Sequence, residues 1–157
     1  MKRIFAVALI MIMAISVFVG CSSDNEVAEV NPSDIISQIN EKYPDAVKGL
    51  TELKEKSDLN RYYEIDEKDI DGFAAVINTD SSKAALEIVI VKTDNVEDVK
   101  QKLNIRYQAI ISQYASYSAE QLKMAKEGGV EATDGYVYLV VAENAKDIMS
   151  LISESLS

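Results

Sequence analysis

The sequence predicts an α+β domain in which a three-stranded antiparallel sheet packs against helices and one helix precedes the sheet. Three observations carry this prediction. Residues 73–78 and 84–92 are short apolar runs, rich in β-branched side chains, on either side of a turn. An apolar stripe of helical period follows them from residue 96 to residue 114. A third β-branched run, residues 136–142, comes after that helix.

The first predicted helix begins at Asn31, because asparagine caps helices well and Pro32 takes the first helical position. Pro44 ends the helix, because a proline disfavours helical backbone in the residue before it. The apolar stripe of this helix consists of Ile35, Ile36 and Ile39. The sequence therefore predicts one amphipathic helix ahead of the sheet.

The segment between this helix and the sheet has a weaker pattern. Residues 45–57 are charged and are compatible with a further helix. Acidic capping residues predict two short helical turns, at 58–63 and 66–69. Residues 79–83 have turn chemistry, so the first two strands are predicted to form a hairpin.

The long helix is predicted to start after Asp94 or Asn95, and its apolar residues recur at steps of three and four. These residues are Val96, Val99, Leu103, Tyr107, Ile110 and Tyr114. Ser118 opens a capping box, so a second short helix follows and runs to about Lys126. Gly128-Gly129 is interpreted as the end of that helix.

Residues 130–133 lead into a tight turn at Asp134-Gly135, and a closing amphipathic helix at 145–156 follows the third strand. The long helix carries the chain from strand two to strand three. A right-handed crossover favours strand three beside strand one. The predicted strand order is therefore 2-1-3, a ferredoxin-like split β-α-β arrangement that lacks one edge strand and has its helices on one face.

The first 21 residues have the layout of a secretory signal peptide. Lys2 and Arg3 precede a run at 4–19 that is apolar except for Ser16. The run is shorter than the ~20 residues that comfortably span a bilayer, which favours a cleaved leader over a retained membrane helix. We expect a protein exported across the cytoplasmic membrane.

Residues 18–21, Phe-Val-Gly-Cys, resemble the lipobox of bacterial lipoproteins, although Phe18 stands where leucine is usual. The resemblance implies cleavage after Gly20 and acyl chains, palmitate among them, on Cys21. The alternative is an ordinary secreted protein with an incidental cysteine. We expect a signal peptide at 1–20, a lipidated flexible tether at 21–30 and a single α+β domain at 31–157.

Composition excludes several classes of function. The net charge of −10 becomes −12 when the leader removes Lys2 and Arg3, so contact with nucleic acid is disfavoured. The chain has no histidine and one cysteine, which excludes His-based triads, His-ligated zinc and an internal disulfide. We expect no cofactor, and membrane contact through the lipid on Cys21.

Glu87 is a charged residue inside the strongest predicted strand. A charge on a buried face needs a partner, and Arg106 flanks the apolar stripe of the long helix. The hypothesis is a structural ion pair of Glu87 with Arg106 between sheet and helix. The alternative is that Glu87 faces water, and neither arrangement suits catalysis, because a carboxylate without a partner acid or base makes a poor active site.

The chain contains eight tyrosines and no tryptophan. Tyr136 and Tyr138 share one face of the third strand, since side chains alternate along a strand. If Tyr107 and Tyr114 approach that face, the four form an aromatic patch for a ligand or partner. The alternative is ordinary core packing with hydroxyl groups at the surface.

Four acidic residues lie within the segment from Asp66 to Asp71, and such a cluster suggests a calcium-binding loop. Aligned on an EF-hand loop, however, Asn78 stands where the loop needs a bidentate glutamate. Solvated helix caps are the preferred interpretation, and whether this cluster binds a cation is left open. We assign no metal site.

Four short pieces resemble those of a family of lipoproteins from Gram-positive bacteria, classed as domain of unknown function family 4358. The pieces are residues 63–66, 85–88, 99–107 and 135–141 within a resemblance spanning about 59–156. Glu64 departs from the glycine frequent there, and Ser118 lies near a frequent proline. The resemblance implies an architecture and a location but no chemistry.

We therefore expect a lipid-anchored protein on the outer face of a bacterial cytoplasmic membrane, with a non-catalytic domain that binds another envelope protein or a small ligand. The alternatives are an enzyme that uses carboxylates and tyrosines, for example on glycans, and an accessory solute-binding protein.

Overall fold

The computed structural model describes residues 29–80 and 83–157. The predicted signal peptide 1–20, Cys21 and all but the last two residues of the predicted tether lie outside the described residues. In chain order the elements are α1 (Pro32–Lys42), α2 (Pro44–Val47), β1 (Thr51–Leu53), α3 (Lys56–Tyr63), the 3₁₀ turn η1 (Glu67–Asp69), β2 (Gly72–Ile77), β3 (Glu87–Lys92), α4 (Val96–Tyr117), α5 (Ala119–Ala125), β4 (Gly129–Thr133), β5 (Tyr136–Val141) and α6 (Ala145–Leu156).

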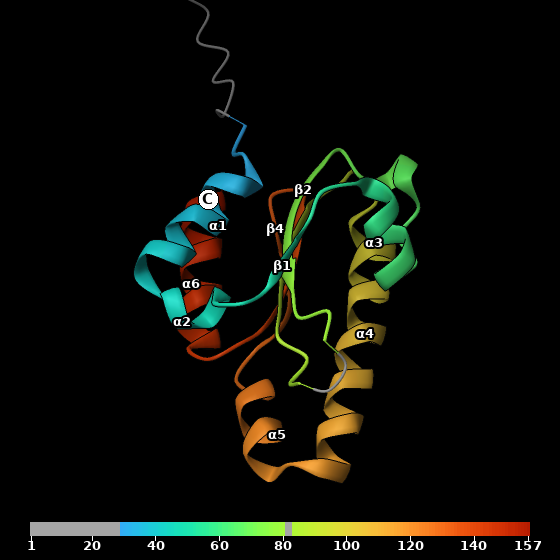
Figure 1. Ribbon diagram of the computed structural model, residues 1–157. Helices are drawn as coiled ribbons and strands as arrows, with labels where there is room; N and C mark the ends of the chain where they lie inside the picture. The colour runs from blue at the N-terminus through green and yellow to red at the C-terminus, as the bar shows by residue number, and fades with distance from the viewer. Residues whose placement is uncertain (1–28, 81–82) are drawn as a thin grey trace, which may run out of the picture.

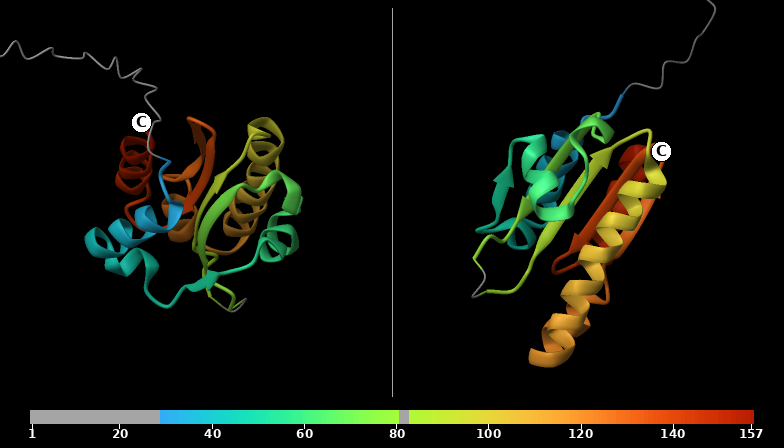
Figure 2. Two further views of the ribbon diagram at one scale, coloured as in Figure 1. Left: turned by 90° about the horizontal axis from the view of Figure 1, so that it is seen from above. Right: turned by 90° about the vertical axis from the view of Figure 1, so that its right-hand side faces the viewer.

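The five strands form one antiparallel sheet in the order β1-β2-β3-β5-β4. Helices α1, α2 and α6 lie on one side of the sheet, and α3 and α4 lie on the other (Figure 1). The view from above in Figure 2 shows the same three layers. The central strands β3 and β5 are thus covered on both faces, which explains their nearly continuous apolar sequences.

The predicted three-stranded sheet is wrong, and so is its order 2-1-3. The second predicted strand, β3, is central, and it pairs with β2 on one side and with β5 on the other. The helices also cover both faces instead of one. The α+β class itself is consistent with this architecture.

The error in strand order has one cause, the missing strand β4. The segment 130–133 was predicted to lead into a turn, but it pairs with β5 from Gly129↔Val140 to Thr133↔Tyr136. Asp134 and Gly135, both with positive φ, are the tight turn of this second hairpin. Because β4 lies between α5 and β5 in the chain, the crossover from β3 delivers β4 parallel to β3, and β5 then turns back between them.

The other missing strand, β1, lies in the segment that was compatible with a helix. Val47, Leu50 and Leu53 have helical spacing, but Gly49, which lies between Val47 and Leu50, has φ +76° and ends the helical conformation there. Thr51, Glu52 and Leu53 instead pair with β2 as a short edge strand. Pairing with a distant strand, which local spacing cannot reveal, decides this segment.

Two helix starts predicted from capping residues, at Asn31 and Ser118, are confirmed, whereas the start predicted at Asp58 is wrong, because α3 begins at Lys56 with Glu55 as its cap. The Asn31 side chain accepts a hydrogen bond from the Ser33 amide at 3.0 Å, with Pro32 at the start of α1. Ser118 ends α4 and accepts a hydrogen bond from the Gln121 amide at 3.2 Å, which opens α5. Each cap satisfies a backbone donor that the first helical turn leaves unpaired.

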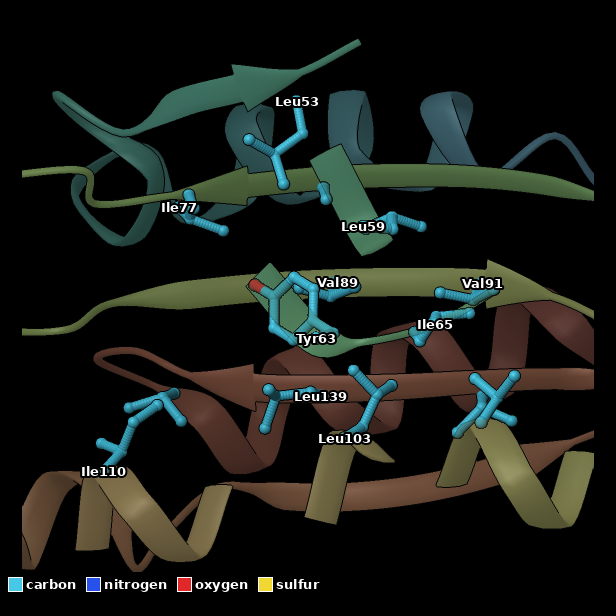
Figure 3. Packing of buried hydrophobic residues seen from close by; sticks show 14 of the residues in the cluster. Leu53, Leu59, Tyr63, Ile65, Ile77, Val89, Val91, Leu103, Ile110 and Leu139 are labelled. Atoms are coloured by element: carbon cyan, nitrogen blue, oxygen red, sulfur yellow. The ribbon is translucent and has the colours of Figure 1, made fainter. Parts of the chain in front are cut away.

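Each sheet face has its own apolar core. On the α4 face, alternate residues of the strands, such as Val89 and Leu139, pack with Leu59, Leu103 and other helix residues (Figure 3). On the α1/α6 face, Ile88, Ile90 and Val140 pack with residues of those two helices. Burying a side chain of this size contributes about 1.5–3 kcal/mol. The two cores hold the sheet between its helices and fix which strand residues can reach a functional surface.

Candidate functional site

Glu87 is the only buried charged side chain in the described part of the chain, with 0% exposure. It is the first residue of β3 and shares a sheet face with Val89. Its neighbours across the sheet are apolar, Ile77 on β2 and Val141 on β5. Any partner for the carboxylate must therefore come from the helices packed on this face.

Arg106 on α4 supplies that partner. Its Nε–H donates to the two carboxylate oxygens of Glu87, at 2.9 Å and 3.2 Å, and its Nη2 also donates to Oε1. The hydrogen bond to Glu87 raises the pKa of Arg106. The arginine side chain is 34% exposed, so the pair lies at the margin of the core. The structure thus brings Glu87 and Arg106 together between sheet and helix.

Tyr63 completes this network from a third segment. Its hydroxyl donates to Oε2 of Glu87 at 3.1 Å. Burial raises the pKa of Tyr63 well above its usual value, and the negative charge of Glu87 adds to the rise. Figure 3 shows Tyr63 among the core residues, at the end of α3. We call Tyr63, Glu87 and Arg106 the buried network.

Local backbone features place Tyr63 correctly. Helix α3 begins with a reciprocal capping box in which Glu55 and Asp58 accept hydrogen bonds from each other's backbone amides. It ends at Glu64, which adopts a left-handed conformation with φ 59° and sends the chain back towards the sheet. Ile65 then enters the core. Residues 63–66 therefore supply the hydrogen-bond donor Tyr63, a reversal of the chain direction at Glu64 and the buried side chain of Ile65.

Tyr114, one of the four tyrosines predicted to form a patch, lies close to the buried network. It is 3% exposed, and burial raises its pKa. Its hydroxyl is the one buried side-chain polar atom in the described residues without a hydrogen-bond partner. Glu87 raises and Arg106 lowers the pKa of Tyr114, which reflects their proximity.

The structure does not bring the four tyrosines together. Tyr107 and Tyr114 belong to the α4 face, whereas Tyr136 and Tyr138 belong to the opposite face. Strand periodicity placed Tyr136 and Tyr138 on one face correctly, but it cannot say which face the long helix covers. Because α4 packs against the Leu139 side of β5, no common aromatic patch forms.

The hydroxyl group of each of the other three tyrosines instead forms hydrogen bonds with another segment of the chain. Tyr107 directs its hydroxyl to the carbonyl oxygens of Ala125 and Gly128, both at 3.2 Å, and so holds the entry to β4. The Tyr136 hydroxyl donates to the Val30 carbonyl at 2.8 Å. The Tyr138 hydroxyl donates to Glu131 at 3.0 Å. These tyrosines have structural roles in the described chain.

A groove of about 530 Å³ lies between β4 and α6. Its floor and one wall come from the start of β4, and its other wall is a polar stripe of α6. The lining residues are Glu127, Gly128, Gly129, Val130, Glu131, Lys146, Met149, Ser150, Ser153 and Glu154. Such a volume falls within the range of ligand sites. We call this feature the β4–α6 groove.

The groove exists because α6 does not cover the whole sheet. Its apolar stripe, which includes Ile148 and Ile152, packs over the centre of the sheet. The adjoining stripe of α6, from Lys146 to Ser153, faces the uncovered surface of β4. Sequence reasoning missed the groove because it missed β4, although the polar residues beside the apolar stripe of the closing helix were a visible signal.

Carboxylates dominate the groove. Glu127, Glu131 and Glu154 outnumber the single cation Lys146. Glu131 is held in place by the hydroxyl of Tyr138, whose ring is buried beneath it at 0% exposure. Burial raises the pKa of Tyr138, and the hydrogen bond to Glu131 contributes to the rise. The groove therefore presents fixed negative charge to solvent.

In the described ranges, no group of three or more His, Cys, Asp or Glu side chains is placed to hold a metal ion. Within the predicted acidic cluster, Asp66 pairs with Lys68 at 3.8 Å, and Glu67 and Asp69 belong to η1. The helices between residues 29 and 157 include none with the length and hydropathy of a membrane span.

Comparison with known proteins gives one match. The model of a family described as "Domain of unknown function (DUF4358)" matches residues 46–142, more than half of the chain. The matched range contains all three members of the buried network and strand β4, whereas α1 and α6 lie outside it. No curated protein and no solved structure matches the chain.

Proposed function

This chain belongs to the family described as Domain of unknown function (DUF4358), and we propose that it is a lipid-anchored binding protein on the outer face of a bacterial cytoplasmic membrane. In this proposal acyl chains on Cys21 hold the chain at the membrane. The folded domain recognises a partner in the envelope and carries out no reaction. Recognition takes place at the β4–α6 groove.

Support for the anchor comes from the leader. Lys2 and Arg3, the apolar run at 4–19 and the small residue before Cys21 are the features that a lipoprotein signal combines. One acyl chain gives only marginal membrane binding, whereas two or more give stable anchoring. The net charge, −10 for the full chain and −12 without Lys2 and Arg3, makes attraction to anionic lipid headgroups unfavourable, so the acyl chains must supply the membrane affinity.

Support for binding without catalysis comes chiefly from the state of Glu87. Among residues 29–80 and 83–157 it is the one carboxylate that is buried and so could serve acid–base chemistry, but Arg106 and Tyr63 occupy both of its oxygens. The carboxylates of the groove, in contrast, are on exposed residues such as Glu127 and Glu154. Exposed charges on an open groove suit recognition of a complementary partner.

The anchor is tested by labelling cells with an alkyne analogue of palmitate. The wild-type chain should incorporate the label and fractionate with membranes. Cys21→Ala should lose the label and either leave the membrane fraction or remain unprocessed, whereas the neighbouring variant Ser22→Ala should behave as wild type. A wild-type chain without label would contradict the anchor.

Binding is tested by placing a photoreactive amino acid at Ser150, which lines the groove and is exposed, in the full chain in living cells. We expect a discrete cross-linked product from Ser150. The matched control is Ser116, an exposed serine near the end of α4 and outside the groove. Equal products from both positions, no product from Ser150, or turnover of a cell-wall glycan by the purified chain would contradict the proposal.

A further inference from the structure

We propose that the occupant of the β4–α6 groove is an extended, cationic segment of an envelope protein that adds to the sheet as a strand beside β4. This inference rests on the proposed function and names the chemistry of its partner. It follows from three observations: the open edge of β4, the shape of the groove above that edge, and the sign of its charge.

Strand β4 has a partner on one side only. It ends the sheet, and within the described residues β5 is the only strand with which it pairs. Backbone donors and acceptors on the outer side of an edge strand remain available to another extended chain. Strand addition uses these groups for affinity and uses pockets for alternate side chains for specificity.

The groove lies where the side chains of an added strand would point. Gly129 and Glu131 project from β4 onto the α6 face, whereas Val130 and Ala132 pack on the α4 face. Gly129 has no side chain, and a Cβ built on it would meet nothing within 4 Å. The groove is therefore open above the first residues of the edge, and every second side chain of an added strand could enter it.

The charge of the groove selects the partner. The three carboxylates against one lysine leave the lining with a net negative charge. A segment with lysine or arginine at alternate positions would place its cations near Glu131 and Glu154. A second copy of this chain is disfavoured, because each copy carries a large net negative charge, −10 with the leader and −12 without it. Complementary charge also raises the rate of encounter.

The opposite edge of the sheet is a much poorer site. Strand β1 has only three residues, Thr51–Leu53. The hollow beside it, between β2 and α1, has a volume of about 120 Å³, against about 530 Å³ at β4. Between the two edges, the space for side chains therefore favours β4.

The test uses the full ¹⁵N-labelled chain in detergent micelles and a seven-residue acetylated peptide, Thr-Lys-Val-Lys-Val-Lys-Thr. We expect chemical-shift changes confined to β4, to the Glu127–Gly128 entry and to the α6 residues of the groove. The acidic counterpart, Thr-Glu-Val-Glu-Val-Glu-Thr, should bind at least tenfold more weakly. Raising the salt to about 0.5 M should weaken binding several-fold, since exposed charges are screened.

Two variants distinguish a loss of binding at the groove from a loss of folding. Gly129→Leu fills the groove from a position with free space, so we expect the same melting behaviour as wild type and at least tenfold weaker binding. The matched control is Gly72→Leu on β2, where a new Cβ would make an ordinary contact of 3.9 Å. It should bind as wild type. Two further peptides carry N-methyl groups on every second amide, one on the odd and one on the even positions. Only one of them should lose binding, because strand addition needs the amide hydrogens that face β4 and not those that face away.

Several results would contradict the proposal that a cationic strand binds beside β4. They are equal binding of the acidic peptide, unchanged binding by Gly129→Leu, or broadening of the β4 signals by self-association without peptide. If the peptide fails but Ser150 still cross-links in cells, the cationic strand is wrong and the binding function stands. If both experiments fail, the binding function is wrong as well.

Discussion

Arg106 on α4 and Glu87 on β3 form an ion pair across the interface between helix and sheet, with Nε 2.9 Å from Oε1. Tyr63 on α3 donates to the second oxygen of the same carboxylate. Three segments that are far apart in the sequence thus meet at one buried charge. These contacts hold α3 and α4 against β3. We therefore expect removal of the ion pair to lower the stability of the domain.

Removing the arginine should destabilise the domain strongly. In Arg106→Met the carboxylate of Glu87 stays buried with Tyr63 as its only partner in the network. An unpaired buried charge costs about 3–5 kcal/mol, and the partial exposure of Arg106 places our expectation near about 3 kcal/mol. Urea unfolding measures this directly. Lys102→Met, which removes an ion pair to Asp98 on the same helix, should cost less than about 1 kcal/mol.

The double variant Glu87→Leu/Arg106→Met gives a sharper result. Apolar replacement of both members of a buried pair is often neutral, because neither charge then has to be desolvated. We expect the double variant to be more stable than Arg106→Met alone. Equal losses in the single and the double variants would show that the ion pair itself is not what Arg106 supplies.

Stability should fall in alkaline solution. Burial raises the pKa of Tyr63 in the folded state, so above about pH 10 the unfolded chain loses a proton that the folded chain keeps. The contribution of Tyr63 to the free energy of unfolding is therefore constant below about pH 10 and decreases above it, by up to about 1.4 kcal/mol per pH unit. The decrease continues until the pH passes the raised pKa of the folded state.

Urea midpoints from about pH 8 to about pH 11 measure this slope. Tyr63→Phe should be less stable at neutral pH, because Glu87 loses a hydrogen bond, and should show a shallower alkaline decrease. Tyr117→Phe, at a side chain that is 84% exposed, is the matched control and should leave the slope as it is in wild type. An unchanged slope in Tyr63→Phe would contradict this account.

Glu64→Gly should stabilise the domain. Glu64 has φ 59°, a left-handed conformation that costs a residue with a Cβ about 1–2 kcal/mol and costs glycine little. We expect a gain of about 0.5–1 kcal/mol, reduced from the full strain by the flexibility of glycine in the unfolded chain. Thermal unfolding measures the gain, and Glu64→Ala should show none. Destabilisation by glycine would mean that the Glu64 side chain makes a contribution larger than the strain.

The paired glycines at the start of β4 should differ in their tolerance of alanine. A Cβ on Gly128 would lie 1.9 Å from the carbonyl oxygen of Val140, so Gly128→Ala must displace the backbone at the β4–β5 pairing. We expect a loss of at least about 2–3 kcal/mol, as for severe overpacking. Gly129→Ala has free space and should change stability by about 0.5 kcal/mol or less. Equal effects in denaturant unfolding would contradict the packing at Gly128.

Local chemistry carried the predictions that succeeded. Asn31 and Ser118 cap helices because their side chains satisfy amides two or three residues away. The apolar stripe of α4 follows from helical geometry alone. Short or polar elements were harder to predict. Thr51–Leu53 and Gly129–Thr133 become strands by pairing with β2 and β5, and their own residue patterns do not reveal this pairing. Missing β4 changed the predicted strand order and concealed the groove.

By itself the sequence determined the helices α1, α4, α5 and α6, the strands β2, β3 and β5, and the need of Glu87 for a partner. Hydrogen bonding to near neighbours and the alternation of side chains, which decide these features, act over a few residues. Only the tertiary structure decided that β3 is central, that Tyr107 and Tyr138 belong to opposite faces, and that α6 leaves β4 uncovered. The reason is that alternative strand orders satisfy the same local preferences. The choice among them depends on which arrangement buries both faces of β3 and β5 at once.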